Sequence, residues 1–257
     1  MSNTFFDLTG KTAIITGSTK GIGRAIAEAL ARAGASVVIS SRKADACNEV
    51  AAELQKEGLN AIAIPCHIGK REEVENLVNE TKRQLGKIDI LVCNAAVNPH
   101  YGPMSTLPDD AFGKVMDSNV RSNWWLCNLV LPDMAARKDG SVIIVSSIAG
   151  LKGSLNLGVY AISKAADFQL ARNLAVEWGA SNIRVNCIAP GIVRTDFARA
   201  LWENPAILTK AEEATPLRRV GEVDDIAGAA VFLASRAGNW MTGQVLVIDG
   251  GVTIVGV

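Results

Sequence analysis

The chain has 257 residues, of which 49% are hydrophobic and 20% are charged, and its formal net charge is zero. This length and composition suit a single α/β domain with a large core. The balanced charge excludes a general electrostatic attraction to nucleic acid or to an anionic membrane surface. No apolar run in the sequence reaches the length of a membrane-spanning helix.

Short β-branched runs alternate with stretches of helical period along the chain. The predicted strands cover residues 11–16, 36–40, 61–66, 88–93, 141–147, 184–188 and 245–248. The predicted helices cover residues 24–33, 44–57, 71–85, 109–137, 160–178 and 224–234. Such alternation requires parallel strands with helices on both faces. We therefore expect an α/β fold in one domain over residues 1–257, a Rossmann-like doubly wound parallel sheet of about seven strands.

Residues 197–215 break this alternation and are rich in alanine and large apolar side chains. They directly follow the end of a predicted strand, where loops commonly carry function. We expect a small substrate lobe, inserted at about residues 196–215, that closes over the site as a lid.

The five cysteines are scattered and never form a C-x-x-C pair; they are Cys47, Cys66, Cys93, Cys127 and Cys187. This pattern predicts no metal site and indicates a reducing compartment. The first residues, M-S-N-T-F-F-D-L, lack the basic region and long apolar core of a secretory signal. We therefore expect a cytoplasmic protein.

A glycine-rich turn, T-G-S-T-K-G-I-G, joins the first predicted strand to the first helix. Gly17 permits the sharp turn, Gly21 lets the backbone approach a pyrophosphate, and Gly23 lets the helix pack closely on the strand. The amino terminus of the helix offers N–H groups and a positive dipole end to phosphate. A glycine triplet alone is often only a loop, but between a strand and a helix it predicts a dinucleotide site.

The second predicted strand ends in S-S-R-K, without the acidic residue that holds the ribose 2′-hydroxyl of NAD. Ser41 occupies that place, and the guanidinium of Arg42 can pair with a 2′-phosphate. Lys20 in the glycine-rich turn could add a second cation. A solvated basic turn accounts for Lys43, but it does not account for the missing acid. This pattern favours NADP(H) as the cofactor.

Tyr160 and Lys164 lie four residues apart at the head of an apolar, alanine-rich helix. Positions i and i+4 share a helix face, so the phenol and the ammonium project to the same place. A free phenol ionises at about pH 10, and a nearby cation favours its ionised form. Ser147 ends the fifth predicted strand, where ligands of parallel sheets collect. The Tyr–Lys spacing alone is weak, because such a pair is also common on a solvated helix face.

Taken together, these motifs resemble the short-chain dehydrogenase/reductase family over essentially the whole chain. The matching segments are the glycine-rich turn, N-A-A at 94–96, Asn119, Ser147, Y-A-I-S-K at 160–164, P-G-I-V-R-T at 190–195 and I-D-G-G at 248–251. The resemblance implies reversible hydride transfer between a nicotinamide cofactor and a ketone or aldehyde. Within the family, the chain looks like NADPH-dependent carbonyl reductases.

The resemblance implies a catalytic tetrad of Asn119, Ser147, Tyr160 and Lys164. Tyr160 would be the general acid in reduction and the base in oxidation, and Ser147 would hydrogen-bond the substrate oxygen. Lys164 would promote ionisation of the phenol and bind the nicotinamide ribose, and Asn119 would hold a water in the proton relay.

The resemblance also implies a set of cofactor-binding residues. Ile192 and Thr195 match the positions that hold the carboxamide, and His67 and Ile68 replace an aspartate that many members use near adenine. His67 could equally be a structural histidine. The full set is Gly17, Ser18, Thr19, Lys20, Gly21, Ile22, Gly23, Ser41, Arg42, His67, Ile68, Asn94, Ala95, Ala96, Tyr160, Lys164, Pro190, Gly191, Ile192 and Thr195.

Substrate contacts are expected from loops near the site and indicate an apolar or aromatic carbonyl compound. Besides Ser147, these residues are His100, Tyr101, Leu155, Phe197 and Trp202. Phe197 and Trp202 could instead anchor the lobe.

Two other functions remain open. In a 3-oxoacyl-type reductase a basic pair would dock the acyl carrier, and here only Lys138 of the corresponding positions 138 and 181 is basic. A protein that binds or senses NADP without turnover is the other alternative, and the intact tetrad argues against it.

Assembly is indicated by apolar residues on more than one face of the two longest helices. These residues are Trp124, Leu126, Leu129, Val130, Phe168, Leu170, Leu174 and Trp178. Such a surplus suggests burial against another subunit, and the resemblance implies a homotetramer. Trp124 and Trp125 are expected in the core or in a subunit interface.

Overall fold

Seven parallel strands form one sheet in the computed structural model, which describes residues 5–255. The strand order is β3-β2-β1-β4-β5-β6-β7, and the pairs are all parallel. The strands are β1 Thr12–Thr16, β2 Ser36–Ser40, β3 Ala61–Ala63, β4 Ile90–Cys93, β5 Gly140–Val145, β6 Ile183–Pro190 and β7 Val245–Ile248. The order reverses between β1 and β4, which is where ligands of doubly wound sheets bind.

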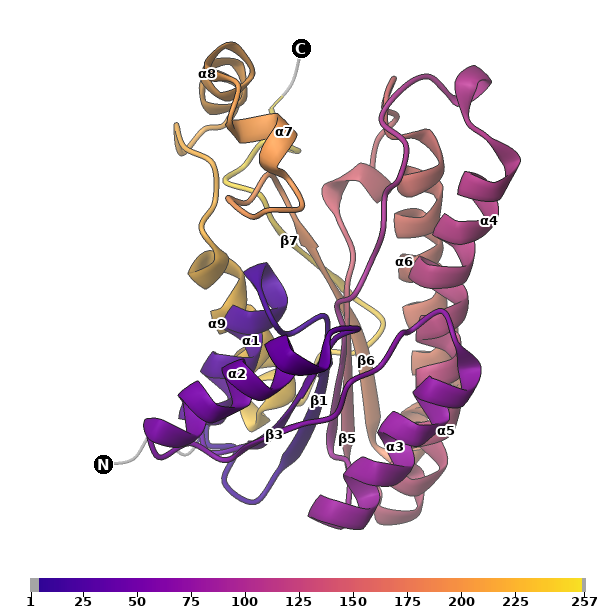
Figure 1. The fold of residues 1–257 in the computed structure, drawn as a ribbon, viewed down its shortest axis with the longest axis vertical. Coiled ribbons are helices and arrows are strands. Elements are labelled where there is room, and N and C mark those ends of the chain that lie inside the picture. The colour runs from indigo at the N-terminus through magenta and orange to yellow at the C-terminus, as the bar shows by residue number, and fades with distance from the viewer. Residues whose placement is uncertain (1–4, 256–257) are drawn as a thin grey trace.

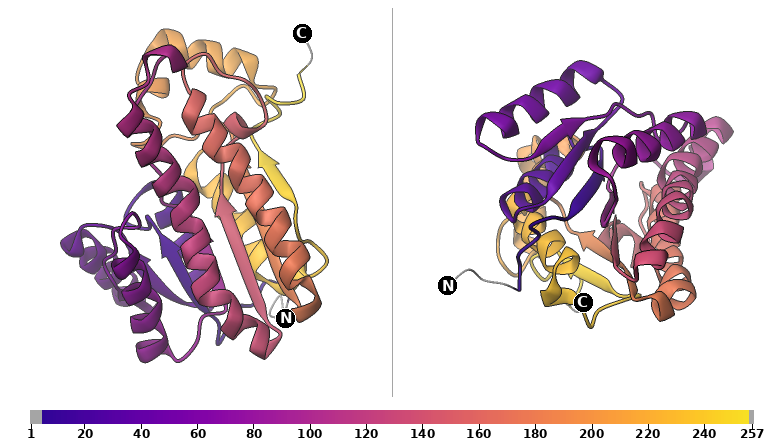
Figure 2. Two further views of the ribbon diagram at one scale, coloured as in Figure 1. Left: turned by 90° about the vertical axis from the view of Figure 1, so that its right-hand side faces the viewer. Right: turned by 90° about the horizontal axis from the view of Figure 1, so that it is seen from below.

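Helices cover both faces of the sheet (Figure 1). They are α1 Gly21–Arg32, α2 Ala44–Lys56, α3 Arg71–Leu85, α4 Asp109–Met116, α5 Ser122–Arg137, α6 Gly158–Trp178, α7 Arg199–Trp202, α8 Pro205–Ala214 and α9 Val223–Ala234. Helices α1, α2 and α9 lie on one side, and α3, α5 and α6 lie on the other, as the view from below in Figure 2 also shows. This is the predicted Rossmann-like α/β fold.

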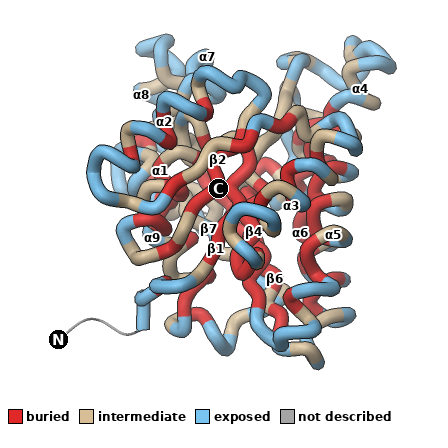
Figure 3. Tube along the Cα trace, turned by 60° about the horizontal axis from the view of Figure 1, so that its bottom comes forward, coloured by how far each residue is buried: buried red, intermediate tan, exposed pale blue. Residues whose placement is uncertain are grey.

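The core has two halves, one on each side of the sheet, and the buried residues follow the strands in Figure 3. Along β1, Ala13 and Ile15 pack toward one helical layer while Ile14 packs toward the other. Both faces of the strand are therefore buried, which is why such strands are continuous apolar runs in the sequence.

Two predicted elements differ from the structure. The third strand was expected over residues 61–66 but ends at Ala63, because Pro65 has no N–H to continue the ladder. The helix expected over 109–137 is divided into α4 and α5 by a π-helical turn, Asp117–Arg121. Such turns are frequent at functional sites, and this one carries Asn119.

Other boundaries shift by a few residues. The first helix begins at Gly21, within the glycine-rich turn, and not at residue 24. The long helix of Tyr160 begins at Gly158, and β5 ends at Val145, so that Ser147 follows the strand by two residues. Ser147 is therefore in the turn beyond the sheet, with its hydroxyl accepting a hydrogen bond from the Ala149 N–H at 3.1 Å.

Some of the apolar residues that were expected on more than one face of the two longest helices are buried in the core. Four of those residues are at most 4% exposed, namely Leu126, Val130, Phe168 and Leu174. Trp125, Leu129, Leu170 and Trp178 are partly buried against the core. Trp124 is 46% exposed, so it is not a core residue.

Residues 197–215 contain two short helices, α7 and α8, which stand at the same end of the molecule as the amino-terminal end of α4 (Figure 1). Within residues 5–255, no helix combines the length and the hydropathy needed to cross a membrane. In the same range, no cluster of His, Cys, Asp or Glu side chains is arranged to hold a metal ion.

Candidate active site

The glycine-rich turn leaves no room for side chains at two of its glycines. Gly17 has φ +68, and a Cβ there would lie 2.9 Å from Nδ2 of Asn94. A Cβ on Gly23 would lie 2.3 Å from the same nitrogen and 2.4 Å from the carbonyl oxygen of Gly17. Real Cβ atoms do not approach other atoms so closely, so both positions require glycine.

The first N–H groups of α1 are not capped by a side chain, since the N-cap residue Lys20 makes no side-chain cap hydrogen bond. The turn therefore presents backbone donors and a helix amino terminus, the donor set that binds pyrophosphate. Gly21 faces Thr195, whose Cγ2 would lie 3.3 Å from a Cβ at that glycine. The residues present fit a dinucleotide between the turn and the loop after β6.

Asn94 and Ser18 serve the scaffold with their side chains. Asn94 donates from Nδ2 to the carbonyl of Thr16 at 2.9 Å and to that of Gly17 at 3.2 Å. In the other direction, Oγ1 of Thr16 accepts hydrogen bonds from the N–H groups of Asn94 at 3.0 Å and Ala95 at 3.1 Å. Ser18 is fully buried, donates to the Ile15 carbonyl at 2.7 Å and accepts from the Ser40 N–H at 2.8 Å. Sequence reasoning missed Thr16, which ties β1 to the loop after β4.

The end of β2 presents an exposed arginine. The hydroxyl of Ser41 lies 3.4 Å from Sγ of Cys47, and the Ser41 N–H donates to the same sulfur at 3.1 Å. Arg42 follows and is exposed. Lys20, expected as a second cation for a phosphate, is instead paired with Asp196 at 3.0 Å. Arg42 is thus an exposed cation directly after Ser41, with Lys43 exposed beside it.

His67 and Ile68 have structural contacts. Nδ1 of His67 accepts from the Gly69 N–H at 3.1 Å, and the His67 N–H donates to Oε2 of Glu73 at 2.7 Å. Ile68 is partly buried against the core. These contacts fit the structural reading of His67.

Tyr160 and Lys164 share the first turns of α6, as the spacing predicts. Nζ of Lys164 lies 5.7 Å from the centroid of the Tyr160 ring. Tyr160 is 9% exposed and Lys164 is 2% exposed. The turn after Ser147 packs directly on this helix, since a Cβ on Gly150 would lie 2.7 Å from the backbone of Ala165 and Lys164. Ser147 is thereby held beside the helix that carries the phenol.

Asn119 lies in the π-helical turn and is fully buried. Its Oδ1 accepts from the Val97 N–H at 2.8 Å, and its Nδ2 donates to the Val97 carbonyl at 3.0 Å and to Oγ of Ser163 at 3.0 Å. The carboxamide therefore joins the loop after β4 to α6. The backbone carbonyl of Asn119 accepts from Nδ2 of Asn123 at 2.7 Å.

The expected substrate residues form two groups. The centroid of the Phe197 ring lies 5.9 Å from the centroid of the Tyr160 ring, and Phe197 is 57% exposed. Trp202 anchors the lobe, because its Nε1 donates to the Thr195 carbonyl at 2.8 Å and Arg194 lies over its ring at 5.6 Å.

The second group comes from two loops that meet. The Gly102 N–H donates to the Asn156 carbonyl at 3.0 Å, which places the loop of Tyr101 beside that of Leu155. Both of these side chains are largely exposed. Nε2 of His100 lies 3.3 Å from Oγ1 of Thr106, so His100 supports its own loop.

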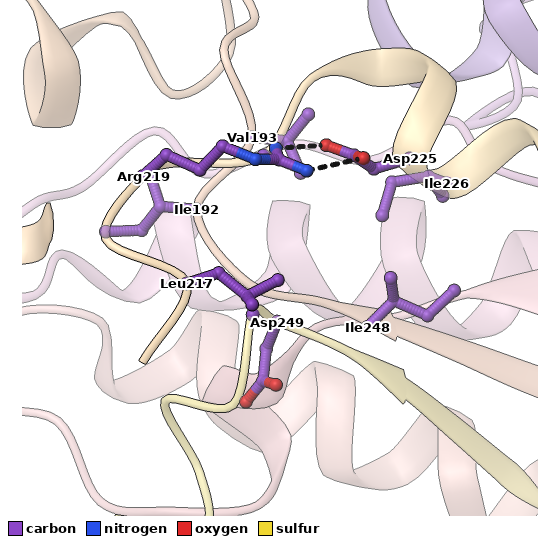
Figure 4. A pocket seen from close by; sticks show the side chains of 10 residues that line it. Ile192, Val193, Leu217, Arg219, Asp225, Ile226, Ile248 and Asp249 are labelled. Carbon is purple, nitrogen blue, oxygen red and sulfur yellow. Dashed lines mark hydrogen bonds and ion pairs between the residues drawn. The ribbon is translucent and has the colours of Figure 1, made fainter. Parts of the chain in front are cut away.

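A cavity of about 120 Å³ lies behind the loop after β6 (Figure 4). Ile192 and Asp249 line it, and the paired side chains of Arg219 and Asp225 close one side. A Cβ on Gly191 would lie 2.9 Å from Asp249, so the loop after Pro190 rests on the end of β7. The cavity lining includes none of Asn119, Ser147, Tyr160 and Lys164.

Comparison with known proteins extends these observations over the chain. A family model described as "Enoyl-(Acyl carrier protein) reductase" matches residues 17–253. "Dehydrogenase/reductase SDR family member 4" of Bos taurus is 43% identical over 244 residues, covering 95% of this chain and 88% of that protein.

Solved structures agree with the fold. A 7α-hydroxysteroid dehydrogenase, complexed with NADH and 7-oxo glycochenodeoxycholic acid, has a TM-score of 0.94 and 41% identity, covering 98% of this chain and 97% of that chain. A gluconate 5-dehydrogenase from Burkholderia cenocepacia, in complex with NADP and tartrate, has a TM-score of 0.95 and 32% identity, covering 98% of this chain and 99% of that chain. With a family match and relatives that span nearly all of its length, this chain belongs to the short-chain dehydrogenase/reductase family of oxidoreductases.

Proposed function

We propose that the protein is an NADP(H)-dependent reductase that converts a ketone or aldehyde to an alcohol, reversibly. One observation carries the proposal: the buried Lys164 ammonium lies 5.7 Å from the centroid of the Tyr160 ring. The ammonium can stabilise negative charge on the phenol while a proton moves to or from it. Tyr160 can then give a proton to a substrate oxygen in reduction and take one back in oxidation.

The other tetrad residues act on the same oxygen and on the phenol. Ser147 donates a hydrogen bond to the substrate oxygen while negative charge develops on it. Its hydroxyl accepts from the Ala149 N–H at 3.1 Å, so its proton is free to point at a ligand. Asn119 positions the loop of Val97 against α6 and would hold the water of the proton relay.

The cofactor lies across the carboxyl ends of β1, β4 and β6 in this proposal. The N–H groups of Gly21, Ile22 and Gly23 bind the pyrophosphate, with Ser18 and Thr19 shaping the turn. Ala95 and Ala96 lie flat against the cofactor, and Pro190, Gly191, Ile192 and Thr195 hold the nicotinamide end. When bound, the nicotinamide supplies or accepts the hydride.

NADP(H) is favoured over NAD(H) by the charge at the end of β2. Arg42 is exposed there and no acidic residue stands beside Ser41, so a 2′-phosphate is attracted and not repelled. The Burkholderia relative was solved with NADP, whereas the hydroxysteroid dehydrogenase was solved with NADH. These two relatives were solved with different cofactors, so the preference proposed here rests on the charge at the end of β2.

The substrate in this proposal is an apolar carbonyl compound. Phe197, Tyr101 and Leu155 present exposed apolar surface. The hydroxysteroid dehydrogenase, 41% identical, was solved with 7-oxo glycochenodeoxycholic acid, a bulky ketone. The lobe of α7 and α8 covers such a substrate.

Two wider expectations complete the proposal. The five cysteines are all buried and free, which suits a reducing, cytoplasmic location. Assembly into a homotetramer would bury the apolar side chains that remain exposed on α5 and α6.

The test is oxidation of NADPH, beside NADH, across a panel of aromatic ketones, steroid ketones, aldehydes and 3-oxoacyl thioesters. We expect turnover of aromatic or steroid ketones with NADPH. Turnover confined to 3-oxoacyl thioesters supports the acyl-type reductase instead. Tight NADPH binding without turnover of any member of the panel contradicts the enzymatic proposal.

A further inference from the structure

A buried ion pair lies on α6 near Tyr160, with its ammonium 5.7 Å from the centroid of the Tyr160 ring. Nζ of Lys164 lies 3.2 Å from Oδ2 of Asp167, one turn further along α6. The two side chains are 2% and 0% exposed. Sequence reasoning missed Asp167, although a carboxylate three residues after Lys164 in an apolar helix is itself a signal, because such residues are almost never fully buried unless paired.

The carboxylate and the ammonium are both held in place by neighbouring elements. Oδ1 of Asp167 accepts from Nδ2 of Asn123 on α5 at 3.0 Å. The same nitrogen of Asn123 donates to the carbonyl of Asn119 in the π-helical turn at 2.7 Å. Nζ of Lys164 also donates to the carbonyl of Val145 at the end of β5 at 3.0 Å. The pair thus connects α5, α6 and β5 under the proposed catalytic centre.

An ammonium buried to this degree does not keep its proton without a counter-charge. Documented buried lysines have pKa values of about 5–6, which would leave the side chain neutral at physiological pH. Burial lowers the pKa of Lys164, but the nearby Asp167 carboxylate and Tyr160 phenol raise it, and the net direction is upward. Asp167 is the largest contribution that favours the charged form of Lys164, and Lys164 in turn opposes the rise that burial causes in the pKa of Asp167.

The other titratable groups that face the pair are thiols and the phenol. Cys93 lies on β4, Cys127 on α5 and Cys187 on β6. A hydrogen bond with Cys127, together with burial, raises the pKa of Cys93, and burial raises the pKa of Cys187. Because burial disfavours the thiolates of Cys93 and Cys187, the negative charge opposite the ammonium comes from Asp167, 3.2 Å away.

We propose that Asp167 is a positioning residue that keeps Lys164 protonated and aims its ammonium beneath the Tyr160 ring. The inference rests on the proposed function, since it concerns the group that promotes ionisation of the catalytic phenol. Asp167 touches neither substrate nor cofactor in this assignment. It acts through Lys164 alone.

The direct test is a titration that needs no turnover. The chain has two tyrosines, so in a Tyr101→Phe background the ultraviolet signal of tyrosinate reports Tyr160. Adding Asp167→Asn removes the anion and keeps the shape of the side chain. We expect the midpoint of this titration to rise by about 1 unit, the low end of the effect of a nearby charge. An unchanged or lowered midpoint would overturn the proposal.

The pH profile of kcat/KM provides a second readout. For alcohol oxidation, Asp167→Asn should move the profile to higher pH by about 1 unit and lower kcat/KM near neutrality about tenfold. A loss that is equal at every pH would show a merely structural role and contradict the assignment. Asp167→Glu, which keeps the anion, should restore the wild-type profile.

Asp89→Asn is the matched control for loss of a buried carboxylate. Asp89 is 2% exposed, lies 3.2 Å from Nζ of Lys87 and accepts from the Thr12 N–H at 2.9 Å. It precedes β4, at the opposite end of the strands from Tyr160. Asp89→Asn should change stability without moving the tyrosinate midpoint or the pH profile.

A double variant keeps the test valid if Asp167→Asn fails to fold. Lys164→Met with Asp167→Asn removes both charges, and loss of a whole buried pair is better tolerated than loss of one partner. Its tyrosinate midpoint should equal that of Lys164→Met alone, because Asp167 has no other route to the phenol. A lower midpoint in the double variant would show that the carboxylate acts on the phenol directly. The tyrosinate titration measures the effect of Asp167 on Tyr160 without turnover. Its result is therefore independent of whether Tyr160→Phe retains activity, so the role of Asp167 and the proposed function can be refuted separately.

Discussion

Nζ of Lys20 lies 3.0 Å from Oδ2 of Asp196, which joins the glycine-rich turn to the segment that carries α7 and α8. Nη2 of Arg199 lies 2.8 Å from the other oxygen of the same carboxylate. The side chains of Lys20 and Asp196 are 69% and 49% exposed. An exposed pair of this kind contributes under about 1 kcal/mol, so a bound ligand can replace it.

The lobe at residues 197–215 should be mobile without ligands and ordered with them. Neither α7 nor α8 contains a buried residue. Segments that bury few apolar side chains open locally at low free-energy cost. Hydrogen exchange there should slow on addition of NADPH and a substrate ketone, while exchange in α9 stays unchanged. Exchange that is equally slow in α8 with and without ligands would contradict the lid.

Lys20→Met should speed exchange in the ligand-free lobe by no more than about fivefold, the equivalent of about 1 kcal/mol. Arg32→Met removes a comparable exposed pair, since Arg32 lies 2.7 Å from Glu57, but lies at the other end of α1. That control should leave the lobe unchanged.

Tyr160→Phe should abolish turnover and leave NADPH affinity near normal. The ring and its packing survive, whereas the proton that is transferred does not. Steady-state rates and a fluorescence titration of NADPH measure the two properties. Tyr101→Phe is the control, with a change limited to KM because Tyr101 lies in the exposed loop beside Leu155. Full activity in Tyr160→Phe would remove the phenol as the acid.

Much of the fold could be predicted from local patterns because a parallel sheet covered on both faces produces continuous apolar strands. The bounds of β2, α3 and β7 agree with the sequence prediction. The π-helical turn at Asn119 was missed, because one wide turn inside a helical pattern leaves no periodic signal.

The sequence supplies the residue types of the proposed site but not the contacts between them. The glycines, Ser147, Tyr160 and Lys164 are identified by local spacing, which a sequence displays. The pairing of Lys20 with Asp196 joins residues far apart in the chain, and the support of Lys164 depends on its burial. Neither long-range pairing nor burial is visible before the chain is folded.

The protein should assemble as a homotetramer. On α5 and α6, Trp124 is 46% exposed, Ile162 is 42% exposed and Val176 is 86% exposed. Apolar side chains gathered on neighbouring helices indicate an interaction surface. Light scattering at micromolar concentration should give a tetrameric mass, and Val176→Glu should reduce it by placing a charge in the interface. Lys56→Glu, exposed on α2, should not. A monomeric mass for the parent protein would refute the assembly.

Cofactor choice should depend on Arg42. Its exposed guanidinium can form charge-assisted hydrogen bonds to a 2′-phosphate, each worth about 1.5–3 kcal/mol, which is roughly tenfold to a hundredfold in affinity. Lys20 should add less, since Asp196 already binds it. We therefore expect kcat/KM to be clearly higher with NADPH than with NADH, by a margin that shrinks as salt rises.

Ser41→Asp combined with Arg42→Ile should reverse this preference. The new carboxylate repels a 2′-phosphate and accepts a hydrogen bond from the ribose hydroxyl of NAD, and the lost guanidinium removes the attraction. Lys43→Ile is the matched control, because Lys43 is a neighbouring exposed cation that the sequence explains as part of a solvated turn. It should change the NADPH to NADH ratio of kcat/KM by less than the Arg42 substitution does. Equal kcat/KM for the two cofactors in the parent enzyme would show that Arg42 does not bind the phosphate.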